Sequence, residues 1–477
     1  MFLMSSKRAL NGALLTISSK IIGKGIDFIT LLVLARTLGP SEFGIVAIAM
    51  TLISIIDMIT DFPVGAALIC MPNISKSHLD TAFTINLARS FLIASVTAAL
   101  SVPFAAIYGM PQLHDLVLAL SLCSVARGMT SPGIALTVKN LDFRPTFVIE
   151  TFGKAIGSIA AITCAYMGAG VWSIVVNTVV APAASSSLSY IIAPCWPRLT
   201  FLQYKYFLSF SGWLSLSKAF AAFNWQYDRL LLGKFVDHAQ FGRYTMANDI
   251  AALPAQSLIL PTVTPMMSTF AKSTGNRPIL TQQYERCLRA VSMVGVPIFF
   301  GLSVAADPLV RALLGEKWLS VVPFLQIIAI EPIFYLLTQP FPALAAALGK
   351  TKILFNLSFV EFMLKLPVIA IGAWQFGAEG VILSRLLCSF ILMIITMYCL
   401  KSMIGLSPFT QLRQCAIPLM AGAAMYCAVG LLGGTIAGVF VNIYVTTAVV
   451  VSVGAMAYLL ALLIAGYNIK SLVAVFR

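Results

Sequence analysis

Charged residues are scarce in this chain of 477 residues. Only 10% of the residues are Asp, Glu, Lys or Arg, whereas 59% are hydrophobic. A soluble domain has about a quarter of its residues charged, so this composition excludes a water-soluble globule. Nearly uncharged stretches of about 20 residues recur along the whole chain, and each is long enough to cross a bilayer as a helix. The composition therefore predicts a polytopic membrane protein.

Motifs for metal, disulfide and nucleotide chemistry are also missing. The nine cysteines form no C-x-x-C pair and no Cys/His cluster with the spacing of zinc ligands. The sequence contains no Walker sequence, kinase loop or Rossmann fingerprint. The loops between the apolar stretches are too short to hold a soluble catalytic domain. We therefore expect no cofactor, no metal and no enzymatic activity.

Fourteen membrane spans are predicted when the chain is divided at charge, Gly and Pro clusters. They include spans over residues 113–137, 317–342, 352–373 and 378–400. An even number of spans places both termini on one side. Seventeen of the 31 basic residues fall in the loops of that side, and the opposite loops hold only Arg36, Lys234, Arg243, Arg311 and Lys317. The positive-inside rule then predicts cytoplasmic termini, so the net charge of +14 reflects topology and not nucleic-acid binding.

An internal repeat relates the two halves of the chain. At an offset of 198, Lys20 matches Lys218 and Phe43-Gly44 matches Phe241-Gly242; at an offset of 211, Glu150 and Lys154 match Glu361 and Lys365. Each copy holds six spans, so the copies have the same orientation and are related by a pseudo-two-fold axis along the membrane normal. We predict an all-α protein with two six-helix lobes, 1–197 and 198–400, and an additional helix pair in 401–477.

Charges inside the predicted spans are costly and mark candidate functional residues. Lys20, Lys24 and Asp27 lie on one face of the first span, and Lys218 recurs in the second copy. Glu150–Lys154 and Glu361–Lys365 are i, i+4 pairs that can neutralise each other, either as structural ion pairs or as part of a binding site. Arg89, Arg127 and Arg385 are expected to be isolated cations. A cavity with surplus positive charge favours an anionic ligand such as pyrophosphate.

Residues 34–44, which read Leu-Ala-Arg-Thr-Leu-Gly-Pro-Ser-Glu-Phe-Gly, resemble the bacterial polysaccharide transporter family. These are Wzx-type flippases of the multidrug/oligosaccharidyl-lipid/polysaccharide exporter superfamily. The resemblance implies fourteen spans as two lobes plus a pair, in agreement with the repeat. It also implies transport of an undecaprenyl-pyrophosphate-linked oligosaccharide across the bacterial inner membrane for exopolysaccharide, capsule or O-antigen synthesis, with polysaccharide polymerase and export machinery as further partners.

The family's cationic cavity implies a substrate-binding set and a set of carboxylates for cation coupling. The cations are Lys20, Lys24, Arg89, Lys154, Lys218 and Lys365, and the coupling candidates are Asp27, Asp57, Asp228 and Asp249. Three alternatives stay open. A drug exporter of the same superfamily fits an acidic cavity better than a basic one. A membrane-embedded polymerase or glycosyltransferase needs a large external loop or a carboxylate pair at the membrane surface. A scaffold protein of an assembly complex does not explain paired buried charges.

Overall fold

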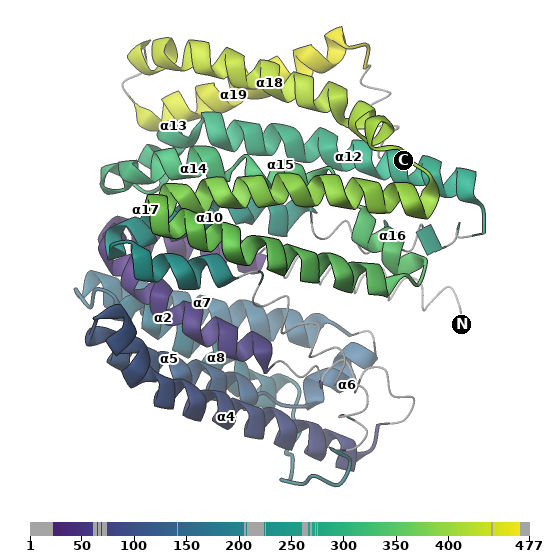
Figure 1. Cartoon of the computed structure of the whole chain (residues 1–477). Coiled ribbons are helices and arrows are strands. Elements are labelled where there is room, and N and C mark those ends of the chain that lie inside the picture. The colour runs from purple at the N-terminus through teal and green to yellow at the C-terminus, as the bar shows by residue number, and fades with distance from the viewer. Residues whose placement is uncertain are drawn as a thin grey trace. The chain divides into compact units, whose positions relative to one another are not determined.

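The computed structural model describes residues 22–60, 74–140, 142–204, 226–259, 275–439 and 442–467, with a few single positions between them. Every regular element within these ranges is helical, and no strand occurs there (Figure 1). The chain divides into two compact units, Met1–Gly242 (unit 1) and Arg243–Arg477 (unit 2). The all-α prediction is confirmed, while the predicted lobe boundaries stay a prediction.

Nine helices of the described ranges are long and apolar enough to cross a membrane, and a bent helix pair raises the number to ten. The multi-pass membrane architecture is therefore confirmed. Several of the fourteen predicted spans fall partly or wholly outside the described residues, among them the spans that carry Lys20 and Lys218. The number fourteen stays a prediction.

The described part of unit 1 consists of a helix over residues 22–37 and six further helices, followed by a helical segment over 226–235 and the first turn of α10 (His238–Pro254). The six are α2 (Pro40–Ile59), α4 (Lys76–Tyr108), α5 (Gln112–Gly128), α6 (Gly133–Lys139), α7 (Arg144–Tyr166) and α8 (Trp172–Ile192). Pro40 at the first position and Glu42, whose Oε2 accepts from Gly39 N at 2.8 Å, define the start of α2. Helices α7 and α8 pack closely because small residues face each other: a Cβ on Gly157 would lie 2.5 Å from that of Ala181.

The span predicted over 113–137 is broken. Helix α5 ends at Gly128, and α6 continues from Gly133 after a bend of 55°. Polar groups at the break have partners on α8 and at its C-cap: Ser131 N donates to Ser189 Oγ at 2.8 Å, and the Ser131 hydroxyl donates to Ala193 O at 2.8 Å. Satisfied polar groups make an interrupted helix tolerable in a membrane.

A reciprocal glycine contact joins α2 to the first turn of α10. A Cβ on Gly44 would lie 1.9 Å from His238 O, and a Cβ on Gly242 would lie 1.9 Å from Pro40 O. Both pairs are repeat mates at the offset of 198, since 44 corresponds to 242 and 40 corresponds to 238. The internal repeat is therefore expressed in the structure as a backbone-to-backbone crossing that only glycine permits at these two positions.

Unit 2 holds the rest of α10 with the π-helical turn η1 (Ala255–Ile259), then a series of helices of very different lengths. They are α12 (Arg277–Val304), α13 (Ala306–Leu313), η3 (Glu316–Val321), α14 (Val322–Ile328), α15 (Glu331–Leu336), α16 (Phe341–Ala347), α17 (Thr351–Ile404), α18 (Pro408–Val439) and α19 (Ile443–Ile464). The span predicted over 317–342 is thus built from short segments. Prolines at the starts of α14, α15 and α16 remove helical hydrogen bonds and divide them.

Helix α17 is too long to be one span, because 54 residues rise roughly 80 Å. Gly377 divides it with φ of 57° and ψ of −133°. The arms on either side fold back on each other: a Cβ on Gly380 would lie 2.0 Å from Gly372 O, and Ser384 Oγ donates to Val368 O at 3.0 Å. The predicted spans 352–373 and 378–400 are these two arms.

The final helix pair packs on α12. Tyr458 of α19 donates its hydroxyl to Met293 O at 3.0 Å, and Val429, Val450 and Leu462 lie in a buried apolar cluster between the three helices. A second and larger cluster joins α12, α15 and α16 to the second arm of α17. These contacts hold in place the helices that carry the charged residues of unit 2.

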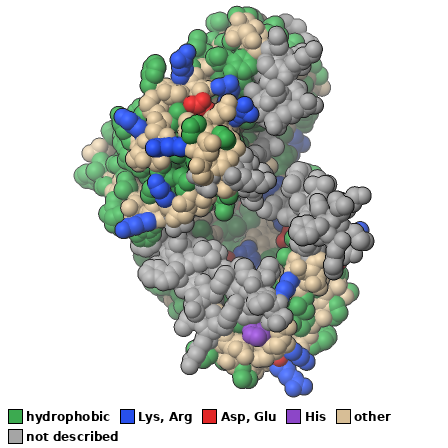
Figure 2. Space-filling view, turned by 90° about the vertical axis from the view of Figure 1, so that its right-hand side faces the viewer, with side chains coloured by type: hydrophobic (Ala, Val, Ile, Leu, Met, Phe, Trp, Pro, Cys, Tyr) green, Lys and Arg blue, Asp and Glu red, His purple; other side chains and the backbone are tan. Residues whose placement is uncertain are grey.

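Basic residues collect at one end of unit 2. The arms of α17 are antiparallel, so Lys350 just before the first arm and Lys352 at its start lie at the same end as Lys401 near the last residue of α17. Arg277 at the start of α12 joins them, because its Nη2 lies 3.5 Å from Met403 O. Figure 2 shows Lys and Arg side chains gathered on the face that it views, with few acidic side chains among them.

Candidate functional site

Four of the six predicted cavity cations are within the described ranges. Lys20 and Lys218 lie outside the described residues, so the recurring lysine of the two copies stays a prediction. Lys24, Arg89, Lys154 and Lys365 are all half-buried on helices. The structure places Arg89, Lys154 and Lys365 in three separate charged groups, two in unit 1 and one in unit 2.

The first group joins the helix over 22–37 to α7. Lys154 Nζ lies 2.6 Å from Asp27 Oδ2, and both side chains are partly exposed. Gly23 makes room for the lysine, since a Cβ there would come within 3.3 Å of Lys154 Nζ. The sequence predicts Glu150 as the acid that neutralises Lys154, but the structure brings Asp27 of another helix to it. The cause is helix packing, which a spacing rule within one helix does not see.

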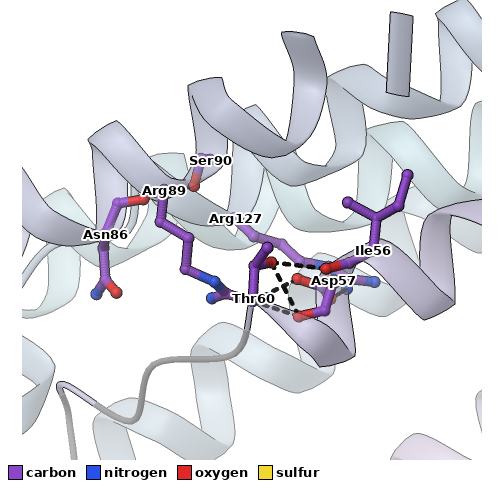
Figure 3. A network of polar contacts seen from close by, with 7 residues as sticks. All are labelled: Ile56, Asp57, Thr60, Asn86, Arg89, Ser90 and Arg127. Atoms are coloured by element: carbon purple, nitrogen blue, oxygen red, sulfur yellow. Dashed lines mark hydrogen bonds and ion pairs between the residues drawn. The ribbon is translucent and has the colours of Figure 1, made fainter. Parts of the chain in front are cut away.

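The second group is centred on Asp57 near the end of α2. Its Oδ1 lies 2.6 Å from Arg89 Nη2, and its Oδ2 lies 3.1 Å from Arg127 Nη1. Arg89 also donates to Asp57 O at 2.9 Å. Figure 3 shows both arginines pointing at this one carboxylate from α4 and α5. The expectation that Arg89 and Arg127 are isolated cations is wrong, because three helices converge on Asp57.

A close helix contact positions the two arginines. A Cβ on Gly128 would lie 1.9 Å from Ser90 Oγ, so only glycine lets the end of α5 approach α4 this closely. Arg127 and Arg89 precede these two residues and are therefore neighbours. A cavity of about 340 Å³ opens beside them and is lined by Asp57, Met58, Asn86, Arg89, Ser90, Ile93, Ser124, Arg127 and Gly128.

The third group lies in unit 2 between α15, α17 and α10. Lys365 Nζ lies 2.5 Å from Glu361 Oε1, so this i, i+4 pair is confirmed. Arg385 Nη2 lies 2.6 Å from Glu331 Oε2, with only 17% and 15% of the two side chains exposed. Ser389 Oγ donates to Glu331 Oε1 at 2.9 Å. The expectation that Arg385 is isolated is wrong, since the helix pieces that carry Glu331 bring it to α17.

Helix α10 completes this third group. Arg385 Nη1 donates to Asn248 Oδ1 at 2.9 Å and to Tyr244 Oη at 2.5 Å, and its guanidinium carbon lies 5.8 Å from the centre of the Tyr244 ring. Sequence reasoning missed Tyr244 and Asn248. The sequence does show that these two polar residues have an i, i+4 spacing and so share one otherwise apolar helix face. It does not show that this face packs against Arg385.

The remaining carboxylate candidates differ in burial. Asp228 is buried with 8% of its surface exposed, and Asp249, next to Asn248 on α10, is half-buried. Among the described residues, no group of three or more His, Cys, Asp or Glu side chains could hold a metal ion. The charged side chains described above instead form ion pairs between carboxylates and basic residues.

Comparison with known proteins shows which families and structures this chain is similar to. A family model described as "Polysaccharide biosynthesis protein" matches residues 33–323. The chain is 24% identical over 410 residues to the lipopolysaccharide biosynthesis protein WzxC of Escherichia coli (strain K12), covering 84% of this chain and 82% of the relative. It is also 24% identical over 351 residues to the succinoglycan biosynthesis transport protein ExoT of Rhizobium meliloti (strain 1021), covering 73% and 71%.

Solved structures show the same fold at low sequence identity. The lipid II flippase MurJ in an inward closed conformation matches with a TM-score of 0.74 at 13% identity, over 95% of this chain and 98% of that one. An inward-facing multidrug resistance transporter of the MATE family matches with a TM-score of 0.63 at 14% identity, over 81% and 98%. The family model covers more than half of the chain, and the fold and the relatives agree with it. The chain therefore belongs to the polysaccharide biosynthesis protein family.

Proposed function

We propose that this chain is a flippase, and not an enzyme, that moves an undecaprenyl-pyrophosphate-linked oligosaccharide across the bacterial inner membrane for exopolysaccharide, capsule or O-antigen synthesis. The membership of the family carries the proposal, and the printed names of the relatives, a lipopolysaccharide biosynthesis protein and a succinoglycan transport protein, support it. The basic residues on the candidate membrane-spanning helices α4, α7 and α17 fit an anionic lipid-linked substrate.

The proposed mechanism is alternating access between two lobes, 1–197 and 198–400, with 401–477 as an additional helix pair. Lys20, Lys24, Arg89, Lys154, Lys218 and Lys365 form the proposed cationic lining that binds the pyrophosphate. The sugars occupy the water-filled cavity, and the lipid tail remains in the bilayer. Cation antiport through one of Asp27, Asp57, Asp228 and Asp249 is the proposed source of energy, and Asp228 is the most buried of the four.

Both termini are proposed to face the cytoplasm. The distribution of charge within unit 2 supports this orientation: Arg277, Lys350, Lys352 and Lys401 lie at one end, whereas Asp307 and Glu316 accompany Arg311 at the other. Cytoplasmic loops collect Lys and Arg. In this orientation the basic end faces the leaflet in which the lipid-linked glycan is assembled, next to the proposed polymerase and export partners.

The alternative of a drug exporter rests on the fold shared with multidrug transporters, and a shared fold does not set the substrate. The described charged groups contain Lys and Arg residues, whose side chains can bind anions. This favours the anionic lipid-linked oligosaccharide over a drug as the substrate. A polymerase or glycosyltransferase needs a large external loop or a carboxylate pair at the membrane surface, and the connections between the helices from α12 to α19 are short.

The leaflet that holds the lipid-linked oligosaccharide tests the proposed function. Cells depleted of the protein are converted to spheroplasts and treated with a membrane-impermeant glycan probe. We expect the intermediate to accumulate on the cytoplasmic face. If the full-length intermediate reaches the outer face and remains unpolymerised, translocation is not the function.

Substitution of the paired lysines tests the cationic lining. Lys20→Ala or Lys218→Ala is expected to abolish export while the protein remains inserted at its normal level, because each removes a cation that binds pyrophosphate. Lys139→Ala, at the end of α6, is the control and should retain export. An equal loss of protein level in all three variants would show that the lysines are structural.

A further inference from the structure

A segment without helical structure follows α8 and crosses the start of α4. It covers residues 194–203 and contains two prolines, which favour an extended backbone. Arg198 N donates to Asp80 Oδ1 at 3.0 Å, and Thr200 N donates to Thr84 Oγ1 at 2.9 Å. Amides two residues apart point the same way along an extended chain. Side chains of α4 therefore bind one edge of the 194–203 segment.

The 194–203 segment lies on the lipid-facing side of α4. Asp80 and Thr84 beneath it are buried, and the same face of the helix continues with exposed residues that are apolar apart from Ser95. The apolar members include Ala88, Phe91, Leu92, Ala99 and Val102. Such a stripe on a candidate membrane-spanning helix faces lipid, because charged and polar residues line a water-filled cavity. The segment therefore continues a surface that lipid covers.

The length of α4 places the segment at the membrane surface. The 33 residues of α4 rise about 50 Å, which exceeds the roughly 40–45 Å of a bilayer with its headgroups. Residues 90–108 carry no charge and rise about 28 Å, which matches the hydrocarbon core. The first part of the helix, with Asp80 and Thr84, therefore lies at the level of the headgroups, and so does the segment bound to it.

The 194–203 segment is itself amphipathic. In an extended chain Leu199 and Phe201 lie on one side, and Arg198 and Thr200 lie on the other. The large apolar side chains of the segment leave between 56% and 78% of their surfaces exposed, and they are Trp196, Leu199, Phe201 and Leu202. Because α4 is bound through the amides, the apolar side of the segment is left to an apolar environment outside the protein.

Aromatic and basic residues accompany this apolar side. The ring centres of Trp196 and Tyr190, in the last turn of α8, lie 5.1 Å apart. Lys76, the first residue of α4, and Arg198 are both exposed. Trp and Tyr are enriched at membrane–water interfaces, and Lys and Arg near the membrane surface attract anionic headgroups. The composition of this region therefore fits the boundary between headgroups and acyl chains.

We propose that the 194–203 segment is an interfacial anchor that inserts Trp196, Leu199 and Phe201 into the boundary between the headgroups and the acyl chains of the bilayer. The inference rests on the multi-pass membrane architecture and goes beyond the proposed function, since it holds for any substrate. The proposed boundary between the two lobes, after residue 197, falls within the segment. The anchor therefore keeps the connection between the lobes at the membrane surface.

Photocrosslinking from single positions tests the anchor. p-Benzoyl-L-phenylalanine is placed at residue 199 of the full-length protein, which is reconstituted into vesicles of phosphatidylethanolamine and phosphatidylglycerol and irradiated. Adducts with lipid acyl chains are counted by mass spectrometry. The probe at residue 198 is the matched control, because it is the neighbour on the polar side, and the probe at residue 91, on the apolar stripe of α4, is the reference for lipid contact. We expect several-fold more acyl-chain adduct from residues 199 and 91 than from residue 198.

Two crosslinking results would overturn the anchor. One is equal acyl-chain adduct from residues 198 and 199. The other is a protein adduct from residue 199 in irradiated whole cells, which would identify a protein as the occupant of this surface.

Fluorescence gives a second measurement that needs no introduced probe. Lipids brominated near the headgroup end of the acyl chain should quench the tryptophan emission of the unaltered protein more than that of Trp196→Phe, because Trp196 lies at that depth. Equal quenching of the two proteins would contradict the insertion of Trp196. Neither measurement depends on transport. Failure of the anchor with normal glycan translocation in cells would therefore leave the flippase function standing.

Discussion

The close backbone contact at Gly44 and Gly242, between α2 and α10, gives the most specific prediction about the stability of the protein. Replacing Gly44 by alanine puts a Cβ 1.9 Å from His238 O, whereas ordinary contacts begin at 3.4 Å. The two backbones must therefore separate by about 1.5 Å, and no side chain can rotate away because the obstructing atom is a main-chain carbonyl. Overpacking costs about 1–3 kcal/mol, and a backbone clash belongs at the upper end of that range.

The expected loss is large enough to measure. Alanine gains up to about 1 kcal/mol of helix propensity over glycine, so the net cost of Gly44→Ala is about 2 kcal/mol. At roughly 2–4 °C per kcal/mol for a domain of this size, the midpoint of thermal unfolding should fall by roughly 4–8 °C. The measurement is the fraction of detergent-purified protein that remains monodisperse after heating. Gly25→Ala, in the same unit and with nothing within 4 Å of the added Cβ, is the control and should not lower the midpoint.

The repeat adds a second arm to this test. Gly242→Ala meets Pro40 O at the same distance of 1.9 Å and should cost as much as Gly44→Ala. The double variant should cost less than the sum, because one separation of the helices relieves both clashes. Equal unfolding midpoints for Gly44→Ala and Gly25→Ala, or full additivity in the double variant, would refute the reasoning.

Two further substitutions probe unit 2. Arg385→Gln removes the arginine that pairs with the Glu331 carboxylate, whose side chain is 15% exposed, and should destabilise the protein by about 3 kcal/mol. Adding Glu331→Gln should restore much of the lost stability. If it restores none, the Arg385–Glu331 pair is not the cause of the destabilisation. Gly377→Ala forces a Cβ into a backbone conformation with φ of 57° and should cost about 2 kcal/mol, whereas Gly430→Ala, with open space around it, should not. Both are measured by the same heating assay, and equal midpoints for Gly377→Ala and Gly430→Ala would contradict the role of the kink.

The charged groups show how the fold pairs ionisable residues that lie on candidate membrane-spanning helices. Asp27 meets Lys154, Asp57 meets two arginines, and Glu331 meets Arg385. Each of these pairs joins different helices, whereas Glu361 and Lys365 neutralise each other within one helix. Pairing lowers the cost of burying a charge but does not remove it.

The sequence by itself determined the class of the protein. Long uncharged stretches have few alternatives to membrane-spanning helices, because a backbone in lipid must satisfy its own hydrogen bonds. The repeat at an offset of 198 was visible without any structure and reappears as the reciprocal crossing of Gly44 and Gly242. The pair of Glu361 and Lys365 was also predictable, since an i, i+4 spacing fixes two side chains on one helix face.

Only the tertiary structure decided which charges meet. Arg89 and Arg127 seemed solitary in sequence because their partner Asp57 lies 32 and 70 residues away, on a helix whose rotation no periodicity specifies. The close approach of α4 and α5 at Gly128, which brings the arginines together, follows from the packing of two surfaces. Spacing rules predict only which side chains share one face of a helix. A binding site forms where the faces of several helices pack together, and spacing does not specify that packing.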